Sequence, residues 1–138
     1  MKSIVLFLGL AFMGLTVVAQ EETVTVTVTI ENVLNDEGTL LVSLHTQQTF
    51  MKGGGIIDLA KKARKGQVTF TFENVKPGTY AIMAMHDVND NQRMDYEANG
   101  MPKESYGMSG NDMTMGPPTF DSAKFVVNEE ELSLNIRF

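Results

Sequence analysis

Residues 23–30 form a strictly alternating run of threonine and β-branched apolar residues. A side-chain period of two places all the apolar members on one face, so the run predicts a half-buried β-strand. Those apolar members are Val24, Val26, Val28 and Ile30. β-Branched residues on both faces favour the same structure. The chain must therefore bury one face of a sheet against a core.

Further segments alternate in the same way or are continuously apolar; they are residues 40–44, 67–72, 79–86, 123–127 and 132–138. The segment 79–86 is apolar on both faces, which is typical of a central strand covered on both sides. Turn residues at 35–38 predict that the first two strands form a hairpin. We expect an all-β fold, an antiparallel two-sheet sandwich of the immunoglobulin or transthyretin type with about six or seven strands.

Two segments interrupt this pattern. In Ile56 to Arg64, several small or apolar residues recur at helical spacing, which predicts one short helix. Asp87 to Asp121 shows no periodicity and contains many glycines and prolines. A connection of about 35 residues is unusual inside a compact domain, so we expect something to organise it.

The N-terminus has the pattern of a secretory signal peptide. Lys2 precedes an uncharged apolar run from Ile4 to Val18, and small residues allow cleavage after Ala19. The run is shorter than the roughly 20 residues of a membrane-spanning helix. The sequence thus predicts a signal peptide at 1–19, a single domain at 20–138, no transmembrane segment after cleavage, and a periplasmic or secreted location.

Composition limits the classes of partner and the sources of stability that are open to this protein. The formal net charge is −6 and the only dense basic cluster lies at residues 61–65, so nucleic acid is not expected as a partner. There are no cysteines, so an exported domain cannot use disulfides and must rely on its core or on a metal ion.

The start of the long loop carries oxygen-bearing side chains at alternate positions. Counting Asp87 as position 1, the loop has Asn89, Asn91 and Asp95 at positions 3, 5 and 9. A chain that curls around a hard cation points every second side chain toward it, and calcium takes six to eight oxygens. Arg93, at position 7, would contribute its backbone carbonyl. This spacing predicts a calcium site, although Asp and Asn also favour turns without any metal.

The loop departs from the helix–loop–helix calcium motif. Position 6 is Gln92 where that motif has glycine, and position 12 is Ala98 where it has a bidentate glutamate. A closing carboxylate must come from elsewhere, and the candidates are Glu97, Glu104 and Asp112. We expect Glu104 to be the closing ligand.

Several blocks of the sequence together resemble an uncharacterised family of exported bacterial domains, domain-of-unknown-function family 2141. The blocks are residues 68–81, the segment His86–Asn91 with Asp95, residues 100–107 and residues 116–120. The family usually has glycine where this chain has Gln92. The resemblance implies a β-sandwich and export, and it implies no activity.

The alternatives to a calcium-ordered module are an enzyme, a copper-binding protein and a glycan- or peptide-binding module. Few residues suit an enzyme, because Gly107-Met-Ser109-Gly110 is not a nucleophile elbow and His86, beside Asp87, is better explained as a structural hydrogen-bond donor. A copper-binding protein would use methionine thioethers, which suit Cu(I). Met83 and Met85 lie near His86 at one strand end, and the loop adds Met94, Met101, Met108, Met113 and Met115. Methionines also fill irregular space in a core, which is the alternative explanation.

A glycan- or peptide-binding module would use a stacking platform of Tyr96, Tyr106 and Phe120, which would otherwise form a small core beneath the loop. The sequence therefore favours a non-enzymatic binding or structural module of the cell envelope with a calcium-ordered loop. Its partner would be a protein or a glycan of the envelope.

Overall fold

The structure, a computed structural model, describes residues 14–112 and 116–138. Within these residues the chain forms strands and one four-residue helix. The strands are β1 (Val24–Val33), β2 (Thr39–His45), β3 (Ile57–Lys62), β4 (Gly66–Val75), β5 (Gly78–Asp87), β6 (Tyr106–Met108), β7 (Phe125–Val127) and β8 (Leu132–Arg137), and the helix α1 is Phe120–Ala123.

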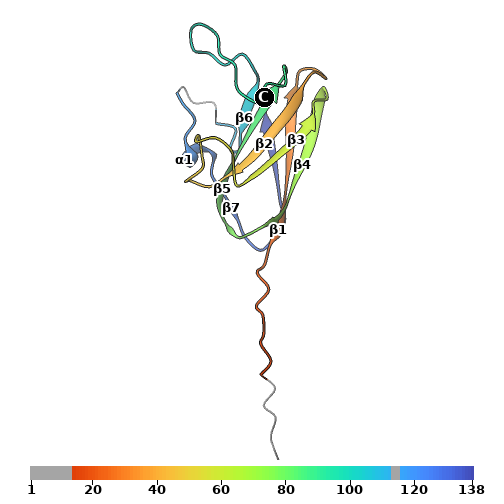
Figure 1. Cartoon of the computed structure of the whole chain (residues 1–138), viewed down its shortest axis with the longest axis vertical. Coiled ribbons are helices and arrows are strands. Elements are labelled where there is room, and N and C mark those ends of the chain that lie inside the picture. The colour runs from red at the N-terminus through yellow and green to blue at the C-terminus, as the bar shows by residue number, and fades with distance from the viewer. Residues whose placement is uncertain (1–13, 113–115) are drawn as a thin grey trace, which may run out of the picture.

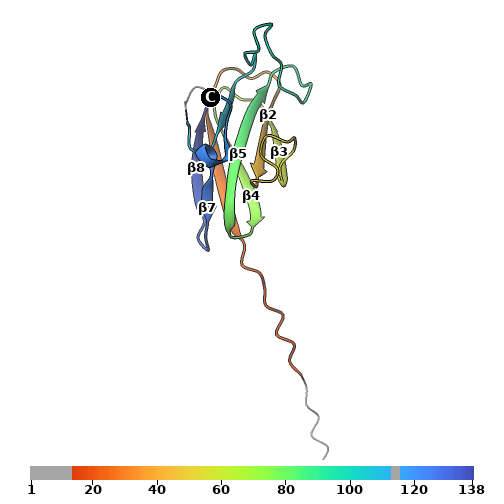
Figure 2. The same ribbon diagram turned by 90° about the vertical axis from the view of Figure 1, so that its left-hand side faces the viewer.

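The strands form two sheets that pack face to face (Figures 1 and 2). One sheet has the order β4-β1-β8, and the other has the order β3-β2-β5-β6, with β7 also paired to β5. The predicted two-sheet sandwich is confirmed. One pairing departs from the antiparallel pattern, because β8 runs parallel to β1.

The core lies between the sheets and is built by the alternating faces. The valines and isoleucine of the first run are buried, as are the apolar residues on one face of β2 and the two phenylalanines of β4. β5 is central, paired to β2 on one side and to β6 and β7 on the other. The inward faces expected from the period-two pattern are therefore confirmed.

The predicted helix at Ile56 to Arg64 is wrong, because this segment contains β3. β3 pairs antiparallel to β2 from Leu44↔Ile57 to Thr39↔Lys62. Ile57 and Leu59 pack against the core, and the Lys61 ammonium lies 5.3 Å from the centre of the Phe70 ring. Strand pairing along an edge of β2 has outweighed the weak helical spacing, as tertiary context often does.

The predicted hairpin between the first two strands is also wrong. β1 pairs with β4 and β8, whereas β2 pairs with β3 and β5, so the turn at 35–38 connects the two sheets. Gly38 makes this crossing possible: its φ is +71°, and a Cβ there would overlap the carbonyl oxygen of Asp87. This close approach joins the crossing to the end of β5.

The long segment after Asp87 is more ordered than its sequence pattern suggests. It contains β6, and its last residues form α1 ahead of β7. Asn111 accepts a hydrogen bond from the Arg137 amide at 2.9 Å and donates one to the Asn135 carbonyl at 2.9 Å. The Asn111 side chain thus covers part of the free edge of β8, an edge that would otherwise expose unpaired backbone groups.

Residues 1–13, which include most of the predicted signal peptide, lie outside the described residues, as do Met113 and Met115. Residues 14–22 are exposed and precede the sandwich. In the described part of the chain no helix is long and apolar enough to cross a membrane.

Gly107 of β6 packs closely against β8. A Cβ at this position would lie 2.7 Å from both the Arg137 carbonyl oxygen and the Ile136 Cγ2. We expect Gly107→Ala to lower the free energy of unfolding by about 1–3 kcal/mol through overpacking. Urea denaturation measures this, with exposed Ser133→Ala as the control; equal midpoints for both variants would contradict the packing argument.

Candidate metal centre

The pairing of β5 with β6 sets the geometry of the loop. Met85 pairs with Tyr106, and the same register continues because the His86 amide donates to the Ser105 carbonyl at 2.8 Å. One further step along this register brings Asp87 and Glu104 opposite each other. These two carboxylates are 17 positions apart in the sequence, yet they flank the loop at neighbouring strand ends.

Asp87 is buried and organises the first turn of the loop. Its side chain is 1% exposed. One carboxylate oxygen accepts a hydrogen bond from the Asn91 amide at 3.2 Å, and the other accepts one from the Gln92 amide at 2.7 Å. Between Asp87 and Gln92 the chain therefore curls back over the Asp87 side chain.

Asn89, Asn91 and Asp95 meet inside this curl. The amide groups of Asn89 and Asn91 donate to the Asp95 carboxylate at 2.7–3.0 Å. Their carbonyl oxygens accept backbone hydrogen bonds two residues ahead, from Asn91 and from Arg93. Four of the predicted ligands thus lie together, and the Asp95 carboxylate faces two amide nitrogens where a cation would need oxygens.

Glu104 is the second buried carboxylate of the loop. The residue is 8% exposed, and its Oε2 accepts a hydrogen bond from the Asp95 amide at 3.1 Å. Its Oε1 is buried, and among residues 14–112 and 116–138 no group donates a hydrogen bond to it. A buried polar atom without a partner is costly, and in native proteins it is frequently explained by a water or an ion.

The charges of the loop are not balanced by basic side chains. Within residues 14–112 and 116–138, the ion pairs involve Lys76, Lys124 and Arg137, and none reaches Asp87, Asp95 or Glu104. In the same residues no group of three or more His, Asp or Glu side chains is spaced to hold a metal ion. Calcium also accepts amide and backbone oxygens, so such a group is not the only way to bind it.

The remaining candidate ligands are Glu97, Asp112 and Arg93. Glu97 is exposed, and its amide donates to the Met101 carbonyl at 2.7 Å. Asp112 follows β6 and so lies beyond the opposite end of that strand from Glu104. Arg93 lies within the loop and donates its amide hydrogen to the Asn91 side chain at 3.1 Å.

Two loop residues adopt left-handed backbone conformations. Asp90 has a φ of 55° and Gln92 a φ of 62°. Gln92 thus takes the conformation for which the helix–loop–helix motif uses glycine, so the loop turns at this point despite its side chain.

Sequence reasoning missed the residue that fixes the outer side of the loop. The Thr39 hydroxyl, at the start of β2, donates to the Asp90 carboxylate at 2.6 Å. These residues are 51 positions apart, and no local pattern links them. Only the pairing of β2 with β5, in which Thr39 lies opposite Asp87, brings them together.

His86 serves as a structural contact. It is 1% exposed, and its Nε2 lies 2.7 Å from the Glu37 carbonyl oxygen. Successive residues of a strand face opposite sides, so His86 points away from the face that carries Met83 and Met85. β6 places Met108 beside Met83 on that other face, where it packs with Phe50 and Phe120. The described methionines and His86 therefore do not form one cluster.

The three residues of the proposed stacking platform come from different elements: Tyr96 lies in the loop, Tyr106 begins β6 and Phe120 begins α1. Tyr96 and Tyr106 are exposed, whereas Phe120 is partly buried and packs against Phe50 with ring centres 5.8 Å apart. Ser109 is buried, its hydroxyl accepting from the Ile82 amide and donating to the Ala123 carbonyl. Ser109 thus links β5 to α1.

Comparison with known sequences places the chain in a family. Residues 28–135 match the family described as "Uncharacterized protein conserved in bacteria (DUF2141)". The chain belongs to this family. No curated protein and no solved structure matches it. The DUF2141 match covers both sheets and the whole loop, and it carries no assigned activity.

Gln92→Gly tests the backbone cost at position 6 of the loop. A left-handed conformation costs a non-glycine residue about 1–2 kcal/mol, and the greater unfolded-state entropy of glycine offsets part of this gain. We expect Gln92→Gly to raise the free energy of unfolding by up to about 1 kcal/mol. Arg93→Gly, at a neighbouring position without a positive φ, is the control and should be destabilising; urea denaturation of the two variants gives the comparison. A stability loss in both would show that no strain is relieved.

Proposed function

We propose that this DUF2141 protein is a non-enzymatic binding or structural module of the bacterial cell envelope whose loop 87–104 binds a calcium ion. The observation that carries the proposal is Glu104 Oε1, a buried carboxylate oxygen that has no hydrogen-bond partner among the described residues and lies beside the loop of alternating oxygen donors. Burying such a group is unfavourable unless a cation or donor meets it. A hard divalent cation supplies that partner.

The ligand set consists of side chains with oxygen donors and one backbone group. Asp87, Asn89, Asn91 and Asp95 supply the curl, Glu104 closes it from the segment that leads into β6, and Arg93 contributes its carbonyl. Asp87, Asp95 and Glu104 form no ion pair with a basic side chain within the described residues, and their negative charge favours a divalent cation. Calcium fits this set better than magnesium, which keeps several of its own waters and is rarely held by an all-protein cage.

Binding requires one exchange within the loop. The Asp95 carboxylate now accepts hydrogen bonds from the amides of Asn89 and Asn91. The cation must replace these donors, and the two amides must then present oxygen. In the absence of the ion, these two amides partly compensate the charge of Asp95 within the curl.

Export supports calcium as the ion. The predicted signal peptide at 1–19 would deliver the domain at 20–138 to the periplasm or beyond, where calcium is more available than in the cytoplasm. Without cysteines, the exported domain has no disulfides, and a bound ion would supply equivalent stability. Its partner would then be a protein or glycan of the envelope.

Glu104→Gln separates ion binding from folding. The amide keeps an acceptor for the Asp95 amide and removes a buried charge, so the metal-free variant should be at least as stable as the parent chain. Calcium at a hundredfold excess over Kd should stabilise the parent by about 2.7 kcal/mol and stabilise the variant far less. Thermal melts with calcium and with chelator measure both effects.

Exposed Glu97→Gln is the matched control, because it makes the same charge change in the same segment and should retain the calcium response. If the melts of the parent chain in calcium and in chelator coincide, the calcium proposal is wrong. A parallel titration with Cu(I) tests the methionine alternative, which a Cu(I)-specific stabilisation would favour.

Asp87→Ala should lower the stability of the protein both with and without calcium. It removes acceptors from the Asn91 and Gln92 amides as well as a ligand. We expect a loss of about 1–3 kcal/mol without metal, from the donors left without partners, together with lower calcium affinity by isothermal titration calorimetry. Unchanged stability in chelator would contradict the structural part of this role.

A further inference from the structure

Residues 95–103 form a small hairpin that projects beyond the sandwich (Figures 1 and 2). The Lys103 amide donates to the Asp95 carbonyl at 2.8 Å, and the Glu97 amide donates to the Met101 carbonyl at 2.7 Å. Tyr96 and Pro102 form a bridge between these rungs. The tip closes with a hydrogen bond from the Gly100 amide to the Glu97 carbonyl at 2.9 Å.

The 95–103 hairpin has no core of its own. None of its residues is buried, and its largest apolar side chains, Tyr96 and Met101, are 59% and 61% exposed. An isolated two-stranded hairpin is at best marginally stable in water. Its order therefore depends on its base, where the two strands leave the sandwich.

The base of the hairpin is made of two proposed ligands. Glu104 is buried at the end of the second strand, and its Oε2 accepts a hydrogen bond from the amide of Asp95 at the start of the first. The Asp95 carboxylate points into the curl formed by Asn89 and Asn91. A cation in this curl would attract both the Asp95 and the Glu104 carboxylates.

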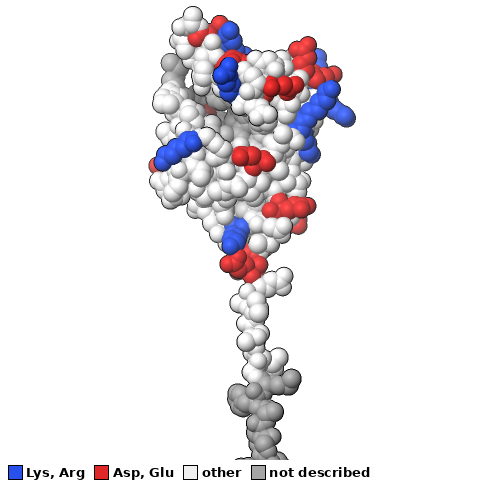
Figure 3. All heavy atoms as spheres, viewed as in Figure 1, with Lys and Arg blue, Asp and Glu red and all other residues white. Residues whose placement is uncertain are grey.

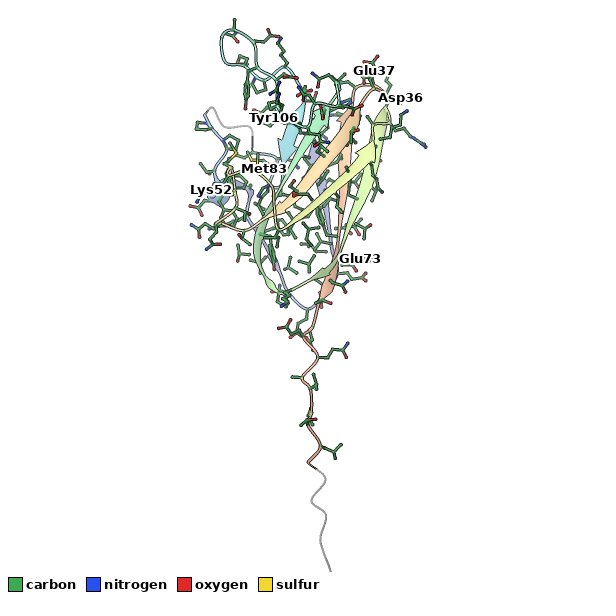
Figure 4. All side chains as sticks on the ribbon, viewed as in Figure 1. Asp36, Glu37, Lys52, Glu73, Met83 and Tyr106 are labelled. Carbon is green, nitrogen blue, oxygen red and sulfur yellow. The ribbon has the colours of Figure 1, made fainter. Side chains whose placement is uncertain are left out.

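Among the described residues, no ion pair from the surroundings holds the base of the hairpin. Figure 3 shows acidic and basic side chains together at this end of the molecule, yet the ion pairs among the described residues leave Asp95 and Glu104 out. Figure 4 shows Tyr106, the first residue of β6, at this end of the sandwich together with Asp36 and Glu37. The hairpin therefore connects to the sandwich through the loop and through β6.

We propose that the ion regulates the 95–103 hairpin: calcium bound between Asp95 and Glu104 closes its base and holds it in the projecting form, and loss of calcium loosens it. This inference rests on the proposed calcium site. Only the ion-bound protein then presents Tyr96 and Met101 in fixed positions. The site would act as a switch for the exposed tip in addition to stabilising the fold.

Hydrogen exchange of individual amides, followed by NMR on the mature chain, tests the switch. The amides of Glu97 and Lys103 report on the two hairpin rungs, and their exchange should slow at least about tenfold when chelator is replaced by excess calcium. The Lys65 amide, which donates to the Asp36 side chain in a different loop, is the internal control and should change little. Glu104→Gln should abolish the calcium effect on the hairpin, and Glu97→Gln should retain it.

Calorimetry on the same samples separates this inference from the proposed function. Calcium binding without slower exchange at Glu97 and Lys103 would overturn the switch and leave the site standing. An equal slowing at Lys65 would also overturn it, because the ion would then act on the fold as a whole. Absence of calcium binding would reject the site itself.

Discussion

The antiparallel pairing of β5 with β6 is the contact on which the loop depends. It is only three residues long, but its register, extended by the hydrogen bond from His86 to Ser105, brings Asp87 and Glu104 to adjacent strand ends. The close packing of Gly107 against β8 holds β6 in this position. Without β6, the segment after Asp87 would have one fixed end, and Glu104 would have no reason to be buried.

The carboxylates of the loop differ in how fully their oxygens are hydrogen-bonded. Asp87 has backbone donors for both oxygens, and Asp95 has the amides of two asparagines. Glu104 keeps one buried oxygen for which the described part of the chain supplies no hydrogen-bond donor. Buried polar groups are normally paired, so the shortage at Glu104 distinguishes this loop from an ordinary Asx-rich turn. The positive φ of Gln92 is a second difference from an ordinary turn, because the chain adopts a strained conformation that keeps the curl closed.

The mistaken elements share a cause. At Ile56 to Arg64 the short apolar pattern fits a helix or a strand, and the free edge of β2 decided in favour of β3. At 35–38 the turn residues are compatible with a hairpin or with a crossing between sheets, and the pairing of β1 with β4 and β8 decided in favour of a crossing. Local sequence defines that a turn or an extended segment occurs, whereas the partner of each strand depends on residues far away in the chain.

The sequence by itself determined which residues face the core and which oxygen donors lie on the curl. Both follow from local periodicity: alternate side chains of a strand share a face, and alternate residues of a tight loop point inward. The tertiary structure decided which glutamate joins the loop and how the loop is anchored. Glu104 lies opposite Asp87, and Thr39 reaches Asp90, only because strands distant in sequence pair in one register, and hydrogen bonds between such strands leave no trace in the spacing of either.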